Sequence, residues 1–178
     1  MRRSTTVLGA ILIPGCWYSA LALHECGHAL AAILLGSKRV RVELPLFGFS
    51  HTTREPDRHA VLTTVAGLLV GAMIPVIVWF GARSIGCAAS RVLQIWAGFA
   101  LILNGGYAAM DALLKGGDGG QLVRHGVPVL LLIACGVLTA AAGLWTWHKL
   151  DRATPAGRAD TVTASSLLLA GILSFLIW

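Results

Sequence analysis

Long apolar runs separated by short polar gaps make up most of the chain. A helix that crosses a bilayer needs about 20 mostly apolar residues. Five stretches meet or approach this length, and they predict helices at about 6–35, 60–82, 92–114, 127–147 and 162–178. Gly15 to Gly36 spans about one membrane thickness, so His24 should lie near mid-depth. The pattern predicts a single all-α membrane domain over residues 1–178, with about five transmembrane helices.

The polar gap after the first helix follows a different period. Between residues 39 and 46, charged residues or proline alternate with valine or leucine. A period of two is typical of a strand, and Gly48 could begin a turn back. We therefore expect a short β-strand or hairpin at about 39–49. An extended substrate could add to its edge, although a simple amphipathic surface strand fits the pattern equally well.

Composition supports the membrane interpretation. Of 178 residues, 56% are hydrophobic and only 12% are charged, about half the charged fraction of a soluble domain. The net charge of +6 comes from basic residues in the short gaps, where they would meet lipid headgroups. No basic-aromatic stripe or nucleic-acid motif accompanies them, so we expect no nucleic-acid partner.

The first residues resemble the start of a signal peptide, with Arg2 and Arg3 before an apolar run. That run continues directly to His24, so we expect a retained signal-anchor helix rather than a cleaved leader. We expect a multi-pass protein of the bacterial cytoplasmic membrane. The basic residues divide evenly between the two sides of the predicted bundle, which leaves the orientation open.

The chemistry is concentrated in residues 24–30, which read HECGHAL. His24 and His28 lie four apart, so on a helix they project from one face and can share a zinc ion. Glu25 can take a proton from water at that ion. Ionisable groups at membrane depth are costly, and no lysine or arginine lies between Arg3 and Lys38 to offset Glu25. A bound cation would offset that cost, whereas a polar role in helix packing is the alternative.

A catalytic zinc also needs a third protein ligand and one position open to water. Five residues could supply that ligand: Asp111, Asp118, Cys26, His51 and His125. Asp118 stands out because four glycines flank it and allow its backbone to approach another helix closely. A solvated interhelical turn is the plainer interpretation of the same residues.

The HECGHAL string resembles the HExGHAL form of the site-2 protease family of intramembrane zinc metalloproteases. That family also has a DG motif at a later helix, which residues 118–122 resemble, and an asparagine upstream, to which Asn104 corresponds. Residues 66–71 are similar to the family's glycine-containing helix, and a strand after the first motif is a further family feature. The resemblance covers roughly residues 15–128.

The resemblance implies that His24, His28 and Asp118 bind Zn²⁺, with Asp111 as the substitute third ligand. It implies that Glu25 is the general base. Asn104 would steady the substrate backbone or the tetrahedral oxygen, although an interhelical hydrogen bond is as good an explanation. The expected activity is hydrolysis of peptide bonds in or near transmembrane segments of membrane-protein substrates.

The alternative is a non-proteolytic protein, such as a metal-binding membrane scaffold or a transporter subunit. The sequence contains no internal repeat of the kind expected of a transporter. A regulatory partner is left open.

Overall fold

The computed structural model describes residues 2–45 and 50–150, with side chains in the first helix from Pro14 onward. The described chain contains a two-stranded sheet and five helices. In chain order these are α1 (Arg2–Leu34), β1 (Arg39–Glu43), β2 (His51–Glu55), α2 (Ala60–Ser84), α3 (Ser90–Leu114), α4 (Gly117–Arg124) and α5 (Val129–His148).

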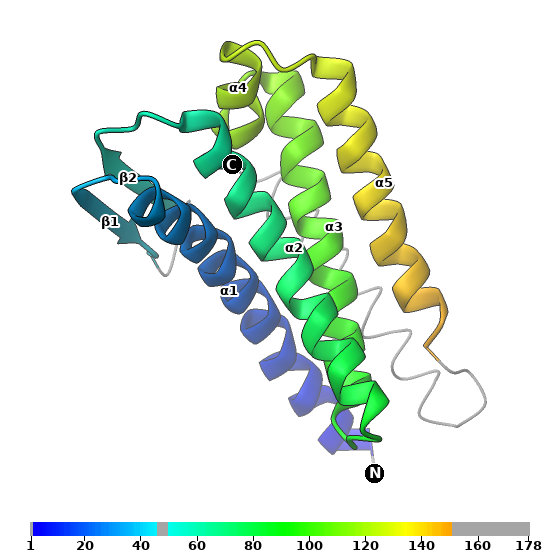
Figure 1. Ribbon diagram of the computed structural model, residues 1–178. Coiled ribbons are helices and arrows are strands. Elements are labelled where there is room, and N and C mark those ends of the chain that lie inside the picture. Colours follow the sequence, from blue (N-terminus) through cyan, green and yellow to red (C-terminus); the bar gives the residue numbers. More distant parts are fainter. Residues whose placement is uncertain (1, 46–49, 151–178) are drawn as a thin grey trace.

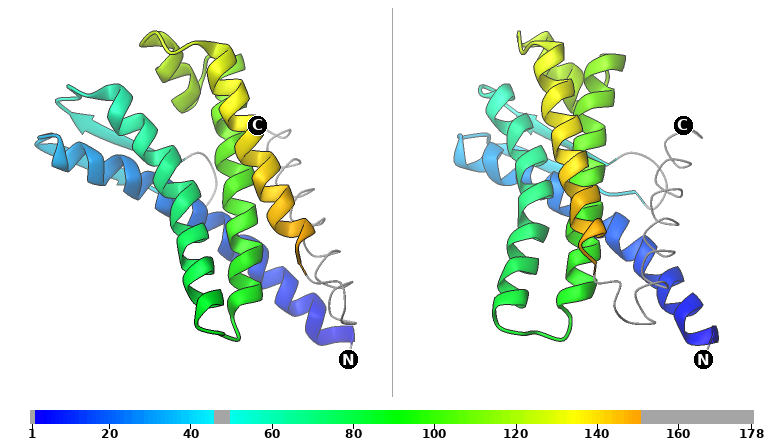
Figure 2. Two further views of the ribbon diagram at one scale, coloured as in Figure 1. Left: turned by 45° about the vertical axis from the view of Figure 1, so that its right-hand side comes forward. Right: turned by 90° about the vertical axis from the view of Figure 1, so that its right-hand side faces the viewer.

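The long helices form a bundle around α3. Helix α3 packs between α2 and α5, and α1 crosses the bundle obliquely while contacting mainly α2 (Figure 1). The hairpin lies beside the C-terminal half of α1, and the short α4 lies next to the C-terminal end of α3 (Figure 2). The hairpin and α4 therefore lie toward the same end of the bundle, one on each side of α2.

Three described helices, rather than five, are long and apolar enough to cross a membrane: α2, α3 and α5. Their bounds lie within two residues of those predicted. Helix α1 is not among them, because two histidines and a glutamate lower the hydropathy of its described part. Within the described residues the expected number of spans is therefore corrected to three. The predicted helix at 162–178 lies outside these residues.

The outer helices expose their apolar side chains as a membrane protein would. On α2, Leu62, Leu69 and Ile77 are each more than half exposed, and on α5 Leu130 is 80% exposed. A water-soluble protein rarely exposes so many large apolar residues on neighbouring helices. These faces are consistent with contact to lipid.

A short antiparallel hairpin after α1 is confirmed, but its second strand, His51–Glu55, lies beyond the predicted range of 39–49. Strands β1 and β2 pair antiparallel, in a register that places Val40 opposite Arg54 and Val42 opposite Thr52. The turn expected at Gly48 falls outside the described residues.

Candidate metal centre

Three potential metal ligands meet between α1 and α4. The Nε2 atoms of His24 and His28 lie 3.0 Å apart. One carboxylate oxygen of Asp118, Oδ2, lies 2.7 Å from the first and 3.0 Å from the second. Both histidines are buried and Asp118 is partly buried, so the group could hold a metal ion away from bulk water.

The outer nitrogens of the two rings fix which atoms face the centre. His24 Nδ1 lies 2.7 Å from Asn104 Oδ1, and His28 Nδ1 lies 2.8 Å from the backbone carbonyl of Thr63. Asn104 uses its amide nitrogen to donate to the Ala100 carbonyl, so its oxygen is the atom that faces His24. Since both partners are acceptors, each Nδ1 donates a hydrogen to its partner, and a neutral ring would then turn the lone pair of Nε2 toward the centre.

This arrangement requires a cation or protons at its centre. Two imidazole lone pairs and a carboxylate oxygen repel one another at hydrogen-bond distance unless something positive lies between them. If protons fill that role, burial raises the pKa of Asp118, but hydrogen bonds to His24 and His28 outweigh it and hold the pKa well below its usual range. A divalent ion would balance the charges of Asp118 and Glu25 together.

The spacing fits a tetrahedral zinc ion after a small expansion. With bonds of about 2.0–2.1 Å, tetrahedral geometry separates neighbouring ligands by about 3.3 Å. The ligand atoms here lie 2.7 to 3.0 Å apart, so rotamer adjustments of a few tenths of an ångström suffice. Two histidines and one carboxylate match the three-ligand set of catalytic zinc sites, which leaves a fourth position for water.

Asp118 reaches the histidines because the chain folds back after α3. Lys115 ends α3 in the left-handed conformation, and Gly117 also has a positive φ of 43°. Helix α4 then returns along the last turns of α3. A side chain on Gly119 would collide there with the backbone of Ala108 and Ala112, so glycine permits the close contact.

Asp111 supports this turn rather than lying in the ligand group. Its carboxylate oxygen accepts a hydrogen bond from the Asp118 backbone N–H at 3.1 Å. An acidic group is favourable at this position because it satisfies a free N–H and faces the positive end of α4.

Helix α2 leaves room for the site through its small residues. A Cβ atom on Gly67 would overlap the ring of His28, and one on Gly71 would lie 2.6 Å from Asn104 Oδ1. Gly67 and Gly71 on α2 therefore accommodate one ligand and the partner of another.

Glu25 is buried beside the ligands and has a polar partner on the hairpin. Glu25 is only 3% exposed. Thr52 Oγ1 on β2 donates a hydrogen bond of 2.6 Å to Glu25 Oε2. The hairpin thus contacts the predicted general base directly.

The remaining ligand candidates lie elsewhere. Cys26 is exposed on α1. His51 is exposed and lies 3.5 Å from Glu43 across the hairpin. His125 pairs with the Gln121 carbonyl at the end of α4.

Sequence reasoning missed two partners of the site, Thr52 and the Thr63 carbonyl. A backbone carbonyl carries no residue-type signal, and Thr52 lies 27 positions from Glu25. The proposed contact of Asn104 with substrate is untested, and the observed contact is a hydrogen bond to His24.

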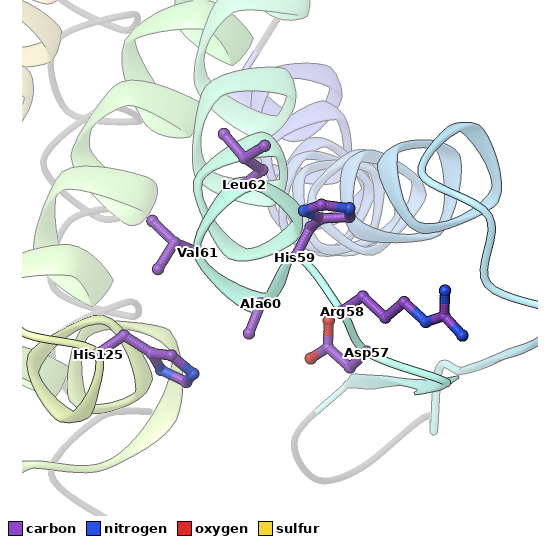
Figure 3. Close-up of a pocket in the computed structure, with 7 residues that line it drawn as sticks. All are labelled: Asp57, Arg58, His59, Ala60, Val61, Leu62 and His125. Atoms are coloured by element: carbon purple, nitrogen blue, oxygen red, sulfur yellow. The ribbon is translucent and has the colours of Figure 1, made fainter.

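A separate cavity of about 290 Å³ lies between the start of α2 and the end of α4 (Figure 3). His125 faces the first turn of α2 across it. None of the three ligand residues lines this cavity; its lining consists of Asp57, Arg58, His59, Ala60, Val61, Leu62 and His125.

Comparison with protein-family models, with curated proteins and with solved structures finds no match to this chain. The geometry of the site and the motif resemblance therefore carry the functional argument.

Proposed function

We propose that this chain is an intramembrane zinc metalloprotease of the site-2 protease type, which hydrolyses peptide bonds in or near transmembrane segments. The observation that carries the proposal is the convergence of His24, His28 and Asp118 beside the buried carboxylate of Glu25. A structural role in helix packing would not require the Nε2 atoms of two histidines and a carboxylate oxygen to meet at one point.

Each residue has a distinct task in this reaction. His24, His28 and Asp118 would hold Zn²⁺, which polarises the scissile carbonyl and makes water more acidic. Glu25 would take a proton from the attacking water and give it to the leaving amine. The hydrogen bond from Thr52 keeps the Glu25 carboxylate in one orientation.

The surroundings of the site support this substrate class. The site lies within the helical bundle: Asn104, the partner of His24, is about 15 Å from the C-terminal end of α3 at 1.5 Å per residue. A transmembrane substrate hides its carbonyls in helical hydrogen bonds, so it must unwind locally before attack. The apolar outer faces of α2 and α5 support a multi-pass location in the membrane.

The decisive test compares the wild-type chain with Glu25→Gln in proteoliposomes. A quenched-fluorescence library of single-span apolar peptides would serve as substrate, and zinc would be measured by mass spectrometry. We expect about one zinc per chain in both proteins and cleavage only by the wild type, because the amide cannot accept a proton. Zinc-free wild-type protein, or equal cleavage by Glu25→Gln, would contradict the proposal.

A further inference from the structure

Strand β2 turns two polar side chains toward the site. Successive residues of a strand point to opposite faces. Thr52 and Arg54 lie on the inner face, while Thr53 and Glu55 on the other face are exposed. The two inner residues contact different parts of the site.

The first contact holds the general base. Thr52 Oγ1 donates to Glu25 Oε2 at 2.6 Å, across a gap of 27 residues. Hydrogen bonds to a charged acceptor are short and stronger than neutral ones. This bond restricts the rotamer of Glu25 without touching any of the three ligands.

The second contact holds α4. The Arg54 side chain is only 7% exposed. Its guanidinium donates to Asp57 Oδ2 at 2.9 Å, to Thr64 Oγ1 at 3.1 Å and to Gln121 Oε1 at 3.2 Å. It therefore joins the hairpin, the first turns of α2 and α4 at one point.

Helix α4 depends on such outside contacts. It has eight residues, three of them glycine, and a helix this short is not stable alone. Gln121 lies three residues after Asp118, so the two side chains lie near each other along α4. Thr64 Oγ1 also donates to Gln121 Oε1 at 3.0 Å, which strengthens the same junction.

We propose that strand β2 positions both the general base and the third metal ligand of the catalytic centre. Thr52 orients the carboxylate of Glu25, and Arg54 fixes α4 so that Asp118 meets the two histidines. The Thr52 part rests on the proposed protease function. The Arg54 part rests only on metal binding, so the two parts can fail separately.

The Thr52 part is tested by steady-state kinetics in proteoliposomes. Thr52→Val should lower kcat about 10- to 100-fold, with KM and zinc content unchanged. Thr52→Ser, which keeps the hydroxyl, should restore most of the rate. Thr53→Val on the exposed face is the matched control and should behave as the wild type.

The Arg54 part is tested by chelator competition for zinc and by hydrogen exchange of residues 116–124. Arg54→Met should raise the zinc dissociation constant about 10- to 100-fold, and should speed exchange in this segment even without zinc. Exposed Arg58 offers the control, since Arg58→Met removes the same charge four residues away. Exchange in α3 and α5 should stay slow, which shows that the fold is intact.

Several outcomes would overturn the positioning role. Wild-type kcat in Thr52→Val, or no rescue by Thr52→Ser, removes the first contact from the mechanism. Unchanged zinc affinity in Arg54→Met, or faster exchange throughout the bundle, removes the second. If the wild type binds zinc but cleaves nothing, the protease proposal fails while the Arg54 result still decides the role of β2 in metal binding.

Discussion

The two faces of α3 differ in how they pack, although adjacent residues provide them. Asn104 faces α1 and hydrogen-bonds to His24. Gly105 faces α5, where a side chain on it would lie 2.5 Å from the Gly136 carbonyl. Gly98 on α3 and Gly143 on α5 make a second close approach between the same two helices, nearer the N-terminal end of α3.

The face of α3 toward α5 stabilises the fold, whereas the face toward α1 supports the metal site. Toward α5, small residues allow backbones to approach closely, and van der Waals contact is the main source of stability in lipid. Toward α1, the buried amide of Asn104 is retained because it has His24 as its partner. The other buried polar groups of α1 have partners outside α3: His28 bonds to the Thr63 carbonyl on α2 and Glu25 to Thr52 on β2. Substitutions on one face should therefore change metal binding, and those on the other should change stability.

The largest effect is expected from the histidines. His24→Ala and His28→Ala should each reduce zinc from about one per chain to near zero, because two ligands cannot retain the ion against a chelator. Metal analysis of the purified variants measures this directly. Glu25→Gln is the control from the same helix turn, and full zinc occupancy in either alanine variant would refute the ligand assignment.

The next effect distinguishes the two acidic residues near the turn after α3. Asp118→Asn should weaken zinc binding by about 100-fold or more, since a neutral amide oxygen is a much weaker zinc ligand than the carboxylate that it replaces. Asp111→Asn should change it only a few-fold, because the amide oxygen can still accept the Asp118 N–H. Competition with a fluorescent chelator compares the two, and a larger loss in Asp111→Asn would reverse their roles.

A smaller effect is expected from Asn104 itself. Asn104→Ala removes the acceptor that orients His24, and loss of such an outer partner weakens metal binding about 10- to 100-fold. Asn104→Asp keeps an acceptor and should retain most of the affinity. Gln94→Ala is the matched control, because Gln94 is also a buried amide on α3 but bonds to the Thr146 carbonyl. If both alanine variants lose zinc equally, Asn104 acts only through the fold.

Much of the fold and part of the candidate site could be predicted from the sequence. Hydropathy predicted α2, α3 and α5, and the four-residue spacing of His24 and His28 predicted a shared face, because both patterns are local. The alternation after α1 likewise predicted strand β1. The separate helix α4 was not predicted, since three glycines in eight residues indicate a turn.

Contacts between distant segments could not be derived in the same way. Whether Asp118 reaches the histidines depends on a reversal at Lys115 and Gly117 that only tertiary packing selects. Thr52 and Arg54 carry no apolar alternation that would mark an inner face. The residues that orient the site are therefore harder to find from sequence than those that form it.

The smallest expected effect tests the packing face with two neighbouring glycines. Gly105→Ala should destabilise the fold by about 1–3 kcal/mol, because the new methyl group overlaps the α5 backbone at Gly136 and Ala140. Gly106→Ala should leave stability unchanged or raise it, since a Cβ there meets nothing within 4 Å and alanine favours a helix. Thermal unfolding in detergent, read by circular dichroism, compares the two. Zinc content at low temperature should stay near one per chain in both, because neither residue contacts the ligands. Loss of zinc in Gly105→Ala without a lower unfolding temperature would show that the two faces of α3 are not independent.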